Sequence, residues 1–362
     1  MTSLLGATGR HPCLLIRSFD PAIASPEDWQ RYHAYRRLRA REDAPEEPVQ
    51  SDDEFEHDLH RRQPFVVHRR FIALCDGEIA GNLGVGMRRE GTPEYASFAP
   101  FVDVWGGVRI ASRRQGAARA LLRPLLALMQ AEDRHTATFR TRDDAGHAFL
   151  QAIGAAQKHR AVENRMPFDG IDWDALARWR APVDAPDSGL RWEVHAGRVP
   201  ESRLAELMAP FTALINEQPL GALELPRMRY ELDGYDSWYA EMDRRGGEHF
   251  LVLLLDADGV AAMCDASWDA RFPDRIYQQL TAVRHDRRGG GLAKAVKARM
   301  LALVCERCPQ ATMAITFNAE VNAPMLSINH RLGYSVYRQE GLYQIGREAL
   351  AERVAQRPTS CS

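Results

Sequence analysis

The order of apolar and polar residues in the C-terminal half predicts alternating strands and helices. Apolar runs bounded by turn residues occur at 250–255, 260–268 and 275–283, as expected for buried strands. The segments 201–215, 291–304 and 323–332 show a helical pattern instead, and 335–346 reads as further strands at the end. The mixture predicts an α/β (α+β) domain in which helices cover a mixed, largely antiparallel sheet.

The N-terminal half repeats this order. Three blocks correspond: 52–81 with 236–262, 108–129 with 281–304, and 143–155 with 321–334, at separations of 182, 175 and 179 residues. Asp76-Gly77 and Asp258-Gly259 occupy equivalent places between short apolar runs, which is a β-hairpin signal. Three blocks in one order at a nearly constant separation indicate duplication of one domain.

The length of the chain agrees with this duplication. A chain of 362 residues exceeds one ordinary core and suits two domains. The join is expected between 168 and 190, where a Trp-containing helix passes into a stretch rich in Pro, Asp, Ser and Gly. We therefore predict an N-terminal domain over 1–178 and a C-terminal domain over 190–362.

Composition narrows the functional classes. A formal net charge of -2 provides no overall field for nucleic acid or anionic lipid. The N-terminus lacks the apolar core of a secretory signal, and no window approaches the apolar length of a membrane span. We expect a cytoplasmic protein, monomeric or homodimeric, with neither nucleic acid nor membrane as a partner.

The cysteines give no framework for disulfides or metal. They are Cys13, Cys75, Cys264, Cys305, Cys308 and Cys361, without regular spacing, as expected for reduced thiols. Cys305 and Cys308 form a CxxC, but no second CxxC or His pair accompanies them to complete a tetrahedral zinc site. We expect no metal.

A glycine-rich loop carries the clearest chemical signal. A strand is expected to end near Val283 and a helix to begin at about Leu292, with three glycines between them. The amides of residues 289–293 would then lie at a helix N-terminus, where unpaired donors and the positive end of the helix dipole favour phosphate or pyrophosphate. Arg288 and Lys294 would add positive charge. The pattern is neither a Walker loop nor a dinucleotide GxGxxG.

This loop carries a family resemblance. The spacing Arg288-x-x-Gly291-x-Ala293, repeated as Arg113-x-x-Gly116-x-Ala118, resembles the acetyl-CoA signature [QR]-x-x-G-x-[GA] of the GNAT N-acetyltransferase superfamily. Residues 322–334, NAPMLSINHRLGY, resemble the later helix of that family and its Leu-Gly-Phe-like turn. The paired arrangement is similar to that of mycothiol synthases and other bacterial tandem-GNAT proteins.

The resemblance implies acetyl transfer from acetyl-CoA, as co-substrate, to a small-molecule amine by direct attack. The loop amides would hold the pyrophosphate, and the preceding strand would offer main-chain hydrogen bonds to the pantetheine arm and to the oxyanion. The implied cofactor-binding residues are Leu280, Thr281, Ala282, Val283, Arg288, Gly289, Gly290, Gly291, Leu292, Ala293, Lys294, Asn322 and Asn329. In the first half they are Val108, Ile110, Arg113, Arg114, Gln115, Gly116, Ala117 and Ala118.

The acid and base depart from the family pattern. Many GNAT members carry a tyrosine four residues before the glycine of the later turn, where this chain has Asn329 and, in the first half, Leu150. Tyr343 is our candidate for a substituting acid, and Tyr337 is a second one. For the base we favour Glu248 over two other carboxylates, and we expect two histidines to be exposed rather than catalytic. These other carboxylates and histidines are Asp103, Glu320, His249 and His285.

The two halves are not equivalent. The second keeps all three loop glycines and both asparagines, whereas the first has Arg114 and Gln115 in the loop and an apolar Leu150. We predict that the C-terminal half is catalytic. The N-terminal half is expected to be a structural partner or to hold a second, unreactive acetyl-CoA.

Other functions stay open from sequence. A non-catalytic acyl-CoA sensor or scaffold would agree with the missing tyrosine. An aminoacyl-tRNA-dependent transferase on duplicated GNAT-like domains would require a basic face and a weakened CoA loop, and neither is present in the sequence. The acceptor is not identified; a cysteinyl sugar is one possibility, and the acidic residues of 217–241 suit a cationic amine.

Overall fold

The computed structural model describes residues 14–356, so Cys13 and Cys361 lie outside the described part. Packing divides the chain into two compact units. Unit 2 is continuous, Gln157–Leu342, whereas unit 1 combines the residues up to Ala156 with those from Tyr343 onward. Within residues 14–356, twelve strands and the helices that cover them form a mixed α/β fold, as the sequence predicts.

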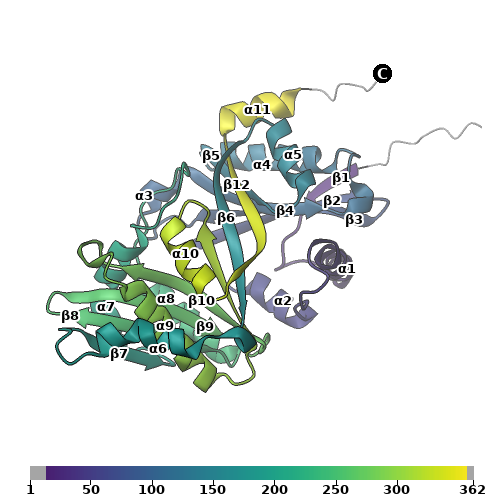
Figure 1. The fold of residues 1–362 in the computed structure, drawn as a ribbon. Coiled ribbons are helices and arrows are strands. Elements are labelled where there is room, and N and C mark those ends of the chain that lie inside the picture. Colours follow the sequence, from purple (N-terminus) through teal and green to yellow (C-terminus); the bar gives the residue numbers. More distant parts are fainter. Residues whose placement is uncertain (1–13, 357–362) are drawn as a thin grey trace, which may run out of the picture. The chain divides into compact units, whose positions relative to one another are not determined.

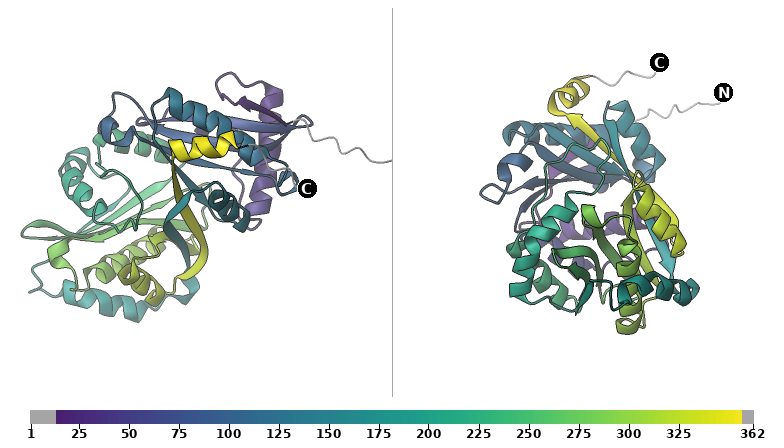
Figure 2. Two further views of the ribbon diagram at one scale, coloured as in Figure 1. Left: turned by 90° about the horizontal axis from the view of Figure 1, so that it is seen from above. Right: turned by 60° about the vertical axis from the view of Figure 1, so that its left-hand side comes forward.

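Unit 1 contains a mixed sheet with strand order β1-β2-β3-β4-β5 followed by the end of β12. Helix α11 packs against α4 in this unit (Figure 2). Its elements are β1 Leu14–Ser18, α1 Pro26–Asp43, α2 Asp52–His60, β2 Val66–Cys75, β3 Glu78–Arg88, α3 Tyr95–Phe98, β4 Phe101–Val108, η1 Ile110–Ser112, α4 Ala117–Ala131, β5 Thr136–Thr141, α5 Asp144–Ala152, the end of β12 Ser335–Gly346, and α11 Arg347–Ala355.

Unit 2 continues with the order β12-β6-β11-β10-β9-β8-β7 (Figure 1). Only β10 and β11 pair in parallel among the registers described for this unit. Its elements are β6 Ala156–Pro167, η2 Phe168–Gly170, α6 Trp173–Asp184, β7 Arg191–Ala196, α7 Glu201–Ile215, α8 Leu232–Arg244, β8 Glu248–Asp256, β9 Gly259–Trp268, β10 Arg275–Val283, η3 His285–Arg287, α9 Leu292–Arg307, β11 Met313–Ala319, α10 Ala323–Arg331 and the start of β12.

The division differs from the sequence-based domains 1–178 and 190–362. Strand β6 and helix α6 precede the linker, yet both belong to unit 2, because Met166 and Leu176 are buried in the same core as α9. The residues from Tyr343 onward, which follow unit 2 in the chain, belong to unit 1, because Tyr343, Ile345 and Leu350 are buried in its core. The final segment 335–346 is one continuous strand, where several were expected.

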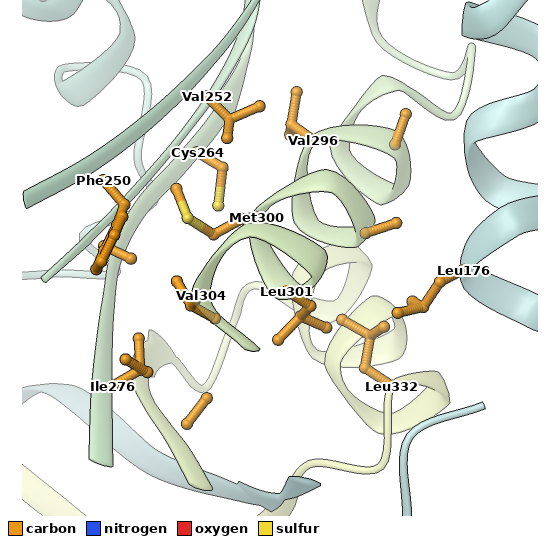
Figure 3. Packing of buried hydrophobic residues seen from close by; sticks show 14 of the residues in the cluster. Leu176, Phe250, Val252, Cys264, Ile276, Val296, Met300, Leu301, Val304 and Leu332 are labelled. Atoms are coloured by element: carbon orange, nitrogen blue, oxygen red, sulfur yellow. The ribbon is translucent and has the colours of Figure 1, made fainter. Parts of the chain in front are cut away.

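Strand β8 of unit 2, next to the edge strand β7, is buried on both faces. Phe250, Val252 and Leu254 face helix α9 and pack with Val296 and Met300 (Figure 3). Leu251, Leu253 and Leu255 face the opposite side and pack with α7 and α8. Successive side chains of a strand point to opposite faces, so one apolar run supplies two cores.

Helix α9 is enclosed on more than one side. Its residues Val296, Met300 and Val304 contact the sheet, and Leu176 and Val183 of α6 complete the same cluster. A helix with apolar residues around most of its circumference is stable only when it is buried in this way. The helix is thereby fixed against β8, β9 and β10, and its N-terminus is fixed at the end of β10.

The exchange of the C-terminal segment generates a stability prediction. Leu350 is 0% exposed in the core of unit 1. Leu350→Ala is expected to lower the free energy of unfolding of unit 1 by about 2 to 5 kcal/mol, because a large buried side chain is lost. Hydrogen exchange should become faster in β3, β4 and β5 and stay unchanged in β8 and β9. Leu15→Ala, at a 57% exposed position of the same unit, is the control. Faster exchange in β8 and β9 alone would contradict the assignment of Leu350 to unit 1.

Candidate functional site

The loop between β10 and α9 has the geometry of an anion site. Gly289 and Gly291 have φ of 83° and 80°, in the left-handed region that glycine adopts without strain. Gly291 is the N-cap of α9 and supplies no side-chain hydrogen bond to the helix amides. A Cβ at either glycine would meet nothing within 4 Å. Open space therefore faces the first turn of a 16-residue helix, where unpaired N–H groups attract anions.

The two cations of the loop have partners. Arg288 donates from Nε to the Val283 carbonyl at 3.3 Å and forms an ion pair with Glu217. The Lys294 ammonium lies 5.7 Å from the centre of the Trp179 ring. Arg288 is exposed, and Ala293 and Lys294 are half-buried, while Leu292 is buried in the core below. The loop is thus anchored through its flanks, and its glycines remain open.

Strand β10 parts from β11 where the ligand arm is expected. The parallel ladder joins 275–278 to 313–316 and ends at the pair Gln278 and Thr316. Beyond it β10 continues to Val283 and pairs with β9 in a shifted register. Gln278 opposes Ala266 and Thr281 opposes Cys264, so residues 279 and 280 together oppose Asp265. Such a β-bulge re-aims side chains and ends the pairing on one side.

The predicted asparagines belong to the segment that follows β11, and their environments differ. Asn322 caps α10 by accepting a hydrogen bond from the Met325 amide at 3.3 Å. Asn329 is 1% exposed and donates to Asn318 Oδ1 at 2.7 Å. Its own Oδ1 is buried without a partner among the described residues. An unpaired buried acceptor costs about 1 to 3 kcal/mol, so this oxygen indicates a missing donor.

Sequence reasoning missed a buried polar cluster on the α9 face. Lys297 is 1% exposed and donates to Gln278 Oε1, which also accepts from the Tyr334 hydroxyl at 3.0 Å. Gln278 Nε2 donates to Cys264 Sγ at 3.2 Å, and Thr281 Oγ1 lies 3.4 Å from the same sulfur. Burial lowers the pKa of Lys297 to about 8. The cluster supports β10 on both sides of its bulge.

A second missed cluster lies on the opposite face, toward α7 and α8. His249 is 3% exposed, contrary to the expected exposure, with Nδ1 2.8 Å from the Tyr239 hydroxyl and Nε2 3.1 Å from Asp265 Oδ1. The alternation of β8 was the available signal, because it places His249 on the face of Leu251 and Leu253. No sequence pattern marks Asp265, which reaches the site through the pairing of β9 with β8 and β10.

The loop of unit 1 has nearly the same backbone. Gly116 has φ of 87° and caps α4 without a side-chain hydrogen bond, and Arg114 has φ of 64° where unit 2 has Gly289. Arg113 repeats the contact of Arg288, from Nε to the Val108 carbonyl at 3.4 Å, and pairs with Asp143 at 2.6 Å. The remaining predicted residues are an exposed Ile110, Gln115 bound to the Ala111 carbonyl, a buried Ala117 and a half-buried Ala118.

Helix α1 occupies the strand end in unit 1. The Tyr35 hydroxyl donates to the Gly107 carbonyl at 2.7 Å, and Arg39 donates to the Val108 carbonyl at 3.3 Å. The Ile110 amide donates to Glu42 Oε1 at 3.0 Å. Main-chain groups of this stretch are therefore bound by side chains of the protein itself. In unit 2 the only such contact described at the equivalent positions is that of Arg288 with the Val283 carbonyl.

The predicted catalytic residues have structural partners. Tyr343 belongs to unit 1, where it is 1% exposed and its hydroxyl lies 2.8 Å from His147 Nδ1. Glu248, at the start of β8, accepts hydrogen bonds from Arg307 at the end of α9, at 2.7 and 3.1 Å. Neither contact supplies support for a role in the unit 2 site, and both roles stay predictions.

The remaining candidates lie at the surface or in packing contacts. Asp103 and Glu320 are exposed and pair with Arg140 and Arg160. His285 is exposed, as expected. The Tyr337 ring is half-buried, with the Arg165 guanidinium 3.4 Å from its centre.

Two classes of site are absent from the described residues. Between residues 14 and 356 no three His, Cys, Asp or Glu side chains gather in a way that could hold a metal. Within the same range no helix has the length and apolar character needed to span a membrane.

No protein-family model matches the chain, and no curated protein matches it in sequence. Solved structures match its fold. A tandem GNAT protein from the clavulanic acid biosynthesis pathway aligns with a TM-score of 0.70 over 92% of this chain and 98% of its own, at 20% identity. A GCN5-related N-acetyltransferase from Sphaerobacter thermophilus aligns with a TM-score of 0.60 over 92% and 96%, at 16% identity.

A third match is the glucosamine N-acetyltransferase region of a fungal multi-domain β-N-acetylglucosaminidase, with a TM-score of 0.63 and 13% identity over 92% of this chain and 38% of that one. The chain therefore has the fold of tandem GNAT proteins, as its motifs predict. At these identities the likeness establishes the fold, and activity has to be argued from the site.

The buried Lys297 predicts a pH-dependent stability. Its pKa is about 8 in the folded protein and 10.5 in the unfolded chain, so between these values the unfolded state binds more protons. The free energy of unfolding of unit 2 should therefore rise from pH 8 to 10.5, by at most about 3 kcal/mol. Urea unfolding of wild type and Lys297→Met across this range measures it, and the variant should lack the rise.

Other groups in this cluster also titrate, so the comparison with a variant is essential. Burial raises the pKa of the Cys264 thiol and of the Tyr334 hydroxyl, and both groups stay in Lys297→Met. Lys294→Met, at a half-buried position of the same helix, is the matched control and should keep the rise. If the free energy of unfolding of wild type depended on pH in the same way as that of Lys297→Met, the folded protein would not lower the pKa of Lys297.

Proposed function

We propose that this protein is an acyl-CoA-dependent acyltransferase, in particular an N-acetyltransferase that transfers acetyl from acetyl-CoA to a small-molecule amine, and that unit 2 performs the reaction. The tandem GNAT fold suggests the broader activity. The observation that carries the proposal is the combination of an open glycine loop at a helix N-terminus with a neighbouring strand that has left its partner.

The residues present fit an acyl-CoA. The loop amides near Gly289 and Gly291 suit a pyrophosphate, and a nearby acceptor, Asn329 Oδ1, lacks the donor that an amide of the pantetheine arm has. The main chain of β10 beyond Gln278 leads directly to this loop. The co-substrate would supply an acetyl thioester at the point where β10 parts from β11.

The protein would contribute orientation and charge stabilisation at this point. The bulge fixes the strand through Gln278 and Thr281, whose side chains are held from below by Lys297 and Cys264. A main-chain N–H of a strand held in this way can donate to an oxyanion without reorganising. Holding two reactants in a defined geometry provides much of the remaining rate increase.

The difference between the units supports the choice of unit 2. In unit 1 the strand end is bound by Tyr35 and Arg39 of α1, and an apolar Leu150 replaces Asn329. Its loop nevertheless keeps Gly116 in the left-handed conformation. We therefore propose unit 1 as a structural domain and leave a second, unreactive acyl-CoA as the outcome to be tested.

The non-catalytic sensor is the main competing function. It would share the same acyl-CoA contacts and differ only in lacking acceptor chemistry. Free CoA released from acetyl-CoA in the presence of a broad amine panel, followed by disulfide exchange, separates the two. The tRNA-dependent transferase has no observation in its favour, since the open loop and the near-neutral charge both speak against it.

Substitution of the loop glycine tests the proposed binding mode. Gly291→Val places a side chain in the space before α9 and is expected to abolish calorimetric binding of acetyl-CoA. The control is Gly197→Val, because Gly197 also has positive φ, 91°, and nothing within 4 Å of a Cβ. Both variants carry similar backbone strain, about 1 to 2 kcal/mol. Unchanged affinity in Gly291→Val would remove the pyrophosphate from this loop.

The same substitution in the other unit tests which unit reacts. Gly116→Val is expected to cost little turnover if unit 1 is structural, with the amine panel and CoA release as the measurement. A loss comparable to that of Gly291→Val would mean that both units contribute to the reaction.

The unpaired Asn329 oxygen yields a second test. Asn329→Leu, which copies Leu150 of unit 1, is expected to weaken acetyl-CoA binding about tenfold, as one hydrogen bond to a buried group is lost. The variant should fold, since Asn318 Oδ1 still accepts from Asn164 at 3.3 Å. Affinity and thermal unfolding are measured on the same sample, and wild-type affinity in a folded variant would refute the contact.

A further inference from the structure

We propose that Asp265 is the residue that receives the acceptor amine, binding it as an ammonium ion and taking its proton, and that His249 and Tyr239 are positioning residues for this carboxylate. The inference rests on the proposed function and adds to it a residue and a substrate class: a primary amine carried on an aromatic or other apolar skeleton. It uses groups on the face of the sheet opposite to α9.

Asp265 lies on β9, opposite the bulge of β10. Residues 279 and 280 of the β10 bulge together oppose it, immediately after the ladder between β10 and β11 ends. Its carboxylate points toward α7 and α8, on the same face as Leu251 and Met263. A group on this face therefore reaches the parting of the strands from the side opposite to Lys297 and the loop helix.

A chain of hydrogen bonds leads from the Val199 amide through Tyr239 and His249 to Asp265, and each group donates to the next. The Val199 amide donates to the Tyr239 hydroxyl oxygen at 3.0 Å, so the hydroxyl proton is left for His249 Nδ1 at 2.8 Å. His249 Nε2–H then donates to Asp265 Oδ1 at 3.1 Å. This chain of hydrogen bonds orients the imidazole and, through it, the carboxylate of Asp265.

The second carboxylate oxygen is available to a ligand. Among residues 14–356, Oδ2 of Asp265 receives no hydrogen bond. The side chain is 11% exposed, which is low enough to strengthen an electrostatic contact and still leaves access. A carboxylate oxygen of this kind suits an N–H donor with a positive charge.

Aromatic rings cluster on the face of the sheet to which this carboxylate belongs. Tyr230 and Tyr235 lie 5.8 Å apart between ring centres and Tyr235 and Trp238 lie 6.2 Å apart. The rings of Trp238 and His249 are nearly perpendicular, with their centres 4.9 Å apart. Tyr230 and Tyr235 are half-buried. Burial and, to a smaller extent, the charge of Asp265 together raise the pKa of Tyr230 to about 12, and the same two causes raise the pKa of Tyr235.

A carboxylate among aromatic faces recognises an ammonium group on an apolar skeleton. The ring faces attract a cation, and their edges and the neighbouring Leu280 accept apolar carbon. An acidic or neutral polar acceptor gains neither contact. The geometry thus selects a cationic amine with apolar flanks among the acceptors of the proposed reaction.

The proposed steps balance. The ammonium R–NH₃⁺ transfers one proton to Asp265 Oδ2 and becomes R–NH₂. The amine nitrogen forms a bond to the acetyl carbon, the carbon–sulfur bond of the thioester breaks, and the second nitrogen proton goes to the CoA sulfur. The products are R–NH–acetyl and CoA–SH, and the proton on Asp265 returns to water.

Unit 1 lacks this arrangement. Gly106 opposes Leu83 in unit 1 as Thr281 opposes Cys264 in unit 2, so the residue at the place of Asp265 is Gly84. A Cβ at Gly84 would lie 2.4 Å from the Trp105 ring, which covers it. A carboxylate is therefore absent from this place in unit 1, and an indole lies over it.

Binding of a matched pair of probes tests the inference. The probes are 2-phenylethylamine and 2-phenylethanol, which share a skeleton and differ in the ammonium group. By calorimetry in the presence of CoA, wild type is expected to bind the amine at least tenfold more tightly than the alcohol. Asp265→Asn should abolish this preference, and Asp265→Glu should retain it. His195→Gln is the control, since His195 forms a similar pair with Glu193 on the edge strand β7.

Turnover of the same amine tests the proton transfer. Asp265→Asn is expected to lower kcat/KM by about 10² to 10⁴, the range for loss of a general base. Tyr239→Phe removes the donor to His249 and should lower kcat about tenfold with KM within twofold. Rates are normalised to the measured stoichiometry of acetyl-CoA binding. A smaller fraction of folded protein therefore does not lower the reported kcat.

Failure of the two proposals can be told apart. Absence of acetyl-CoA binding to wild type would remove the acyltransferase proposal, and the amine preference would still be measured. Normal acetyl-CoA binding without an amine preference, or a preference that survives Asp265→Asn, would overturn the assignment of Asp265. Amine binding that Asp265→Asn abolishes while acetyl-CoA binding is unchanged would support it.

Discussion

The parting of β10 from β11 is the constraint on which the rest of unit 2 depends. A strand that leaves its partner inside a domain exposes main-chain donors and acceptors, and such groups are costly unless water, protein or a ligand binds them. The β8 and β9 strands make the parting possible, because they bury apolar residues on both faces and hold β10 from one side. A buried polar cluster on the α9 face then holds Gln278 and Thr281 on the two sides of the bulge, and Asp265 of a second cluster lies opposite it on β9. The opening is thus a built feature of the sheet.

The two units have nearly the same loop backbone but differ in whether polar side chains bind the main-chain groups at the end of the strand. Both loops place a left-handed glycine before a helix, and both arginines reach the carbonyl at the end of the strand. In unit 1, Tyr35 and Arg39 of α1 donate hydrogen bonds to the main-chain carbonyls at the end of β4. No such helix side chains are described at the end of β10 in unit 2. A duplicated domain can therefore keep its fold while one copy uses for its own packing the groups that the other leaves for a ligand.

The sequence predicts most of the fold and part of the site. The strand 275–283, the hairpin turns at Asp76 and Asp258 and the start of α9 at Leu292 follow from local pattern, and the structure confirms them. The assignment of β6 to unit 2 and of the end of β12 to unit 1 does not follow from local pattern. It depends on the core in which Met166 and Leu350 are buried. Asp265 was missed because only the pairing of β9 with β10 brings it to the bulge. Lys297 was missed because only the packing of α9 on the sheet brings its ammonium to Gln278.

The discontinuity of unit 1 has a consequence for the order in which the molecule is made. Unit 2 is one uninterrupted segment, so it can close as soon as Leu342 has left the ribosome. Unit 1 begins earlier and cannot finish until Ile345 and Leu350, which follow the whole of unit 2, have been made. The first domain to be translated is therefore the last to be completed, and its open core, with Val85, Leu125 and their neighbours, waits in the nascent chain for its final strand.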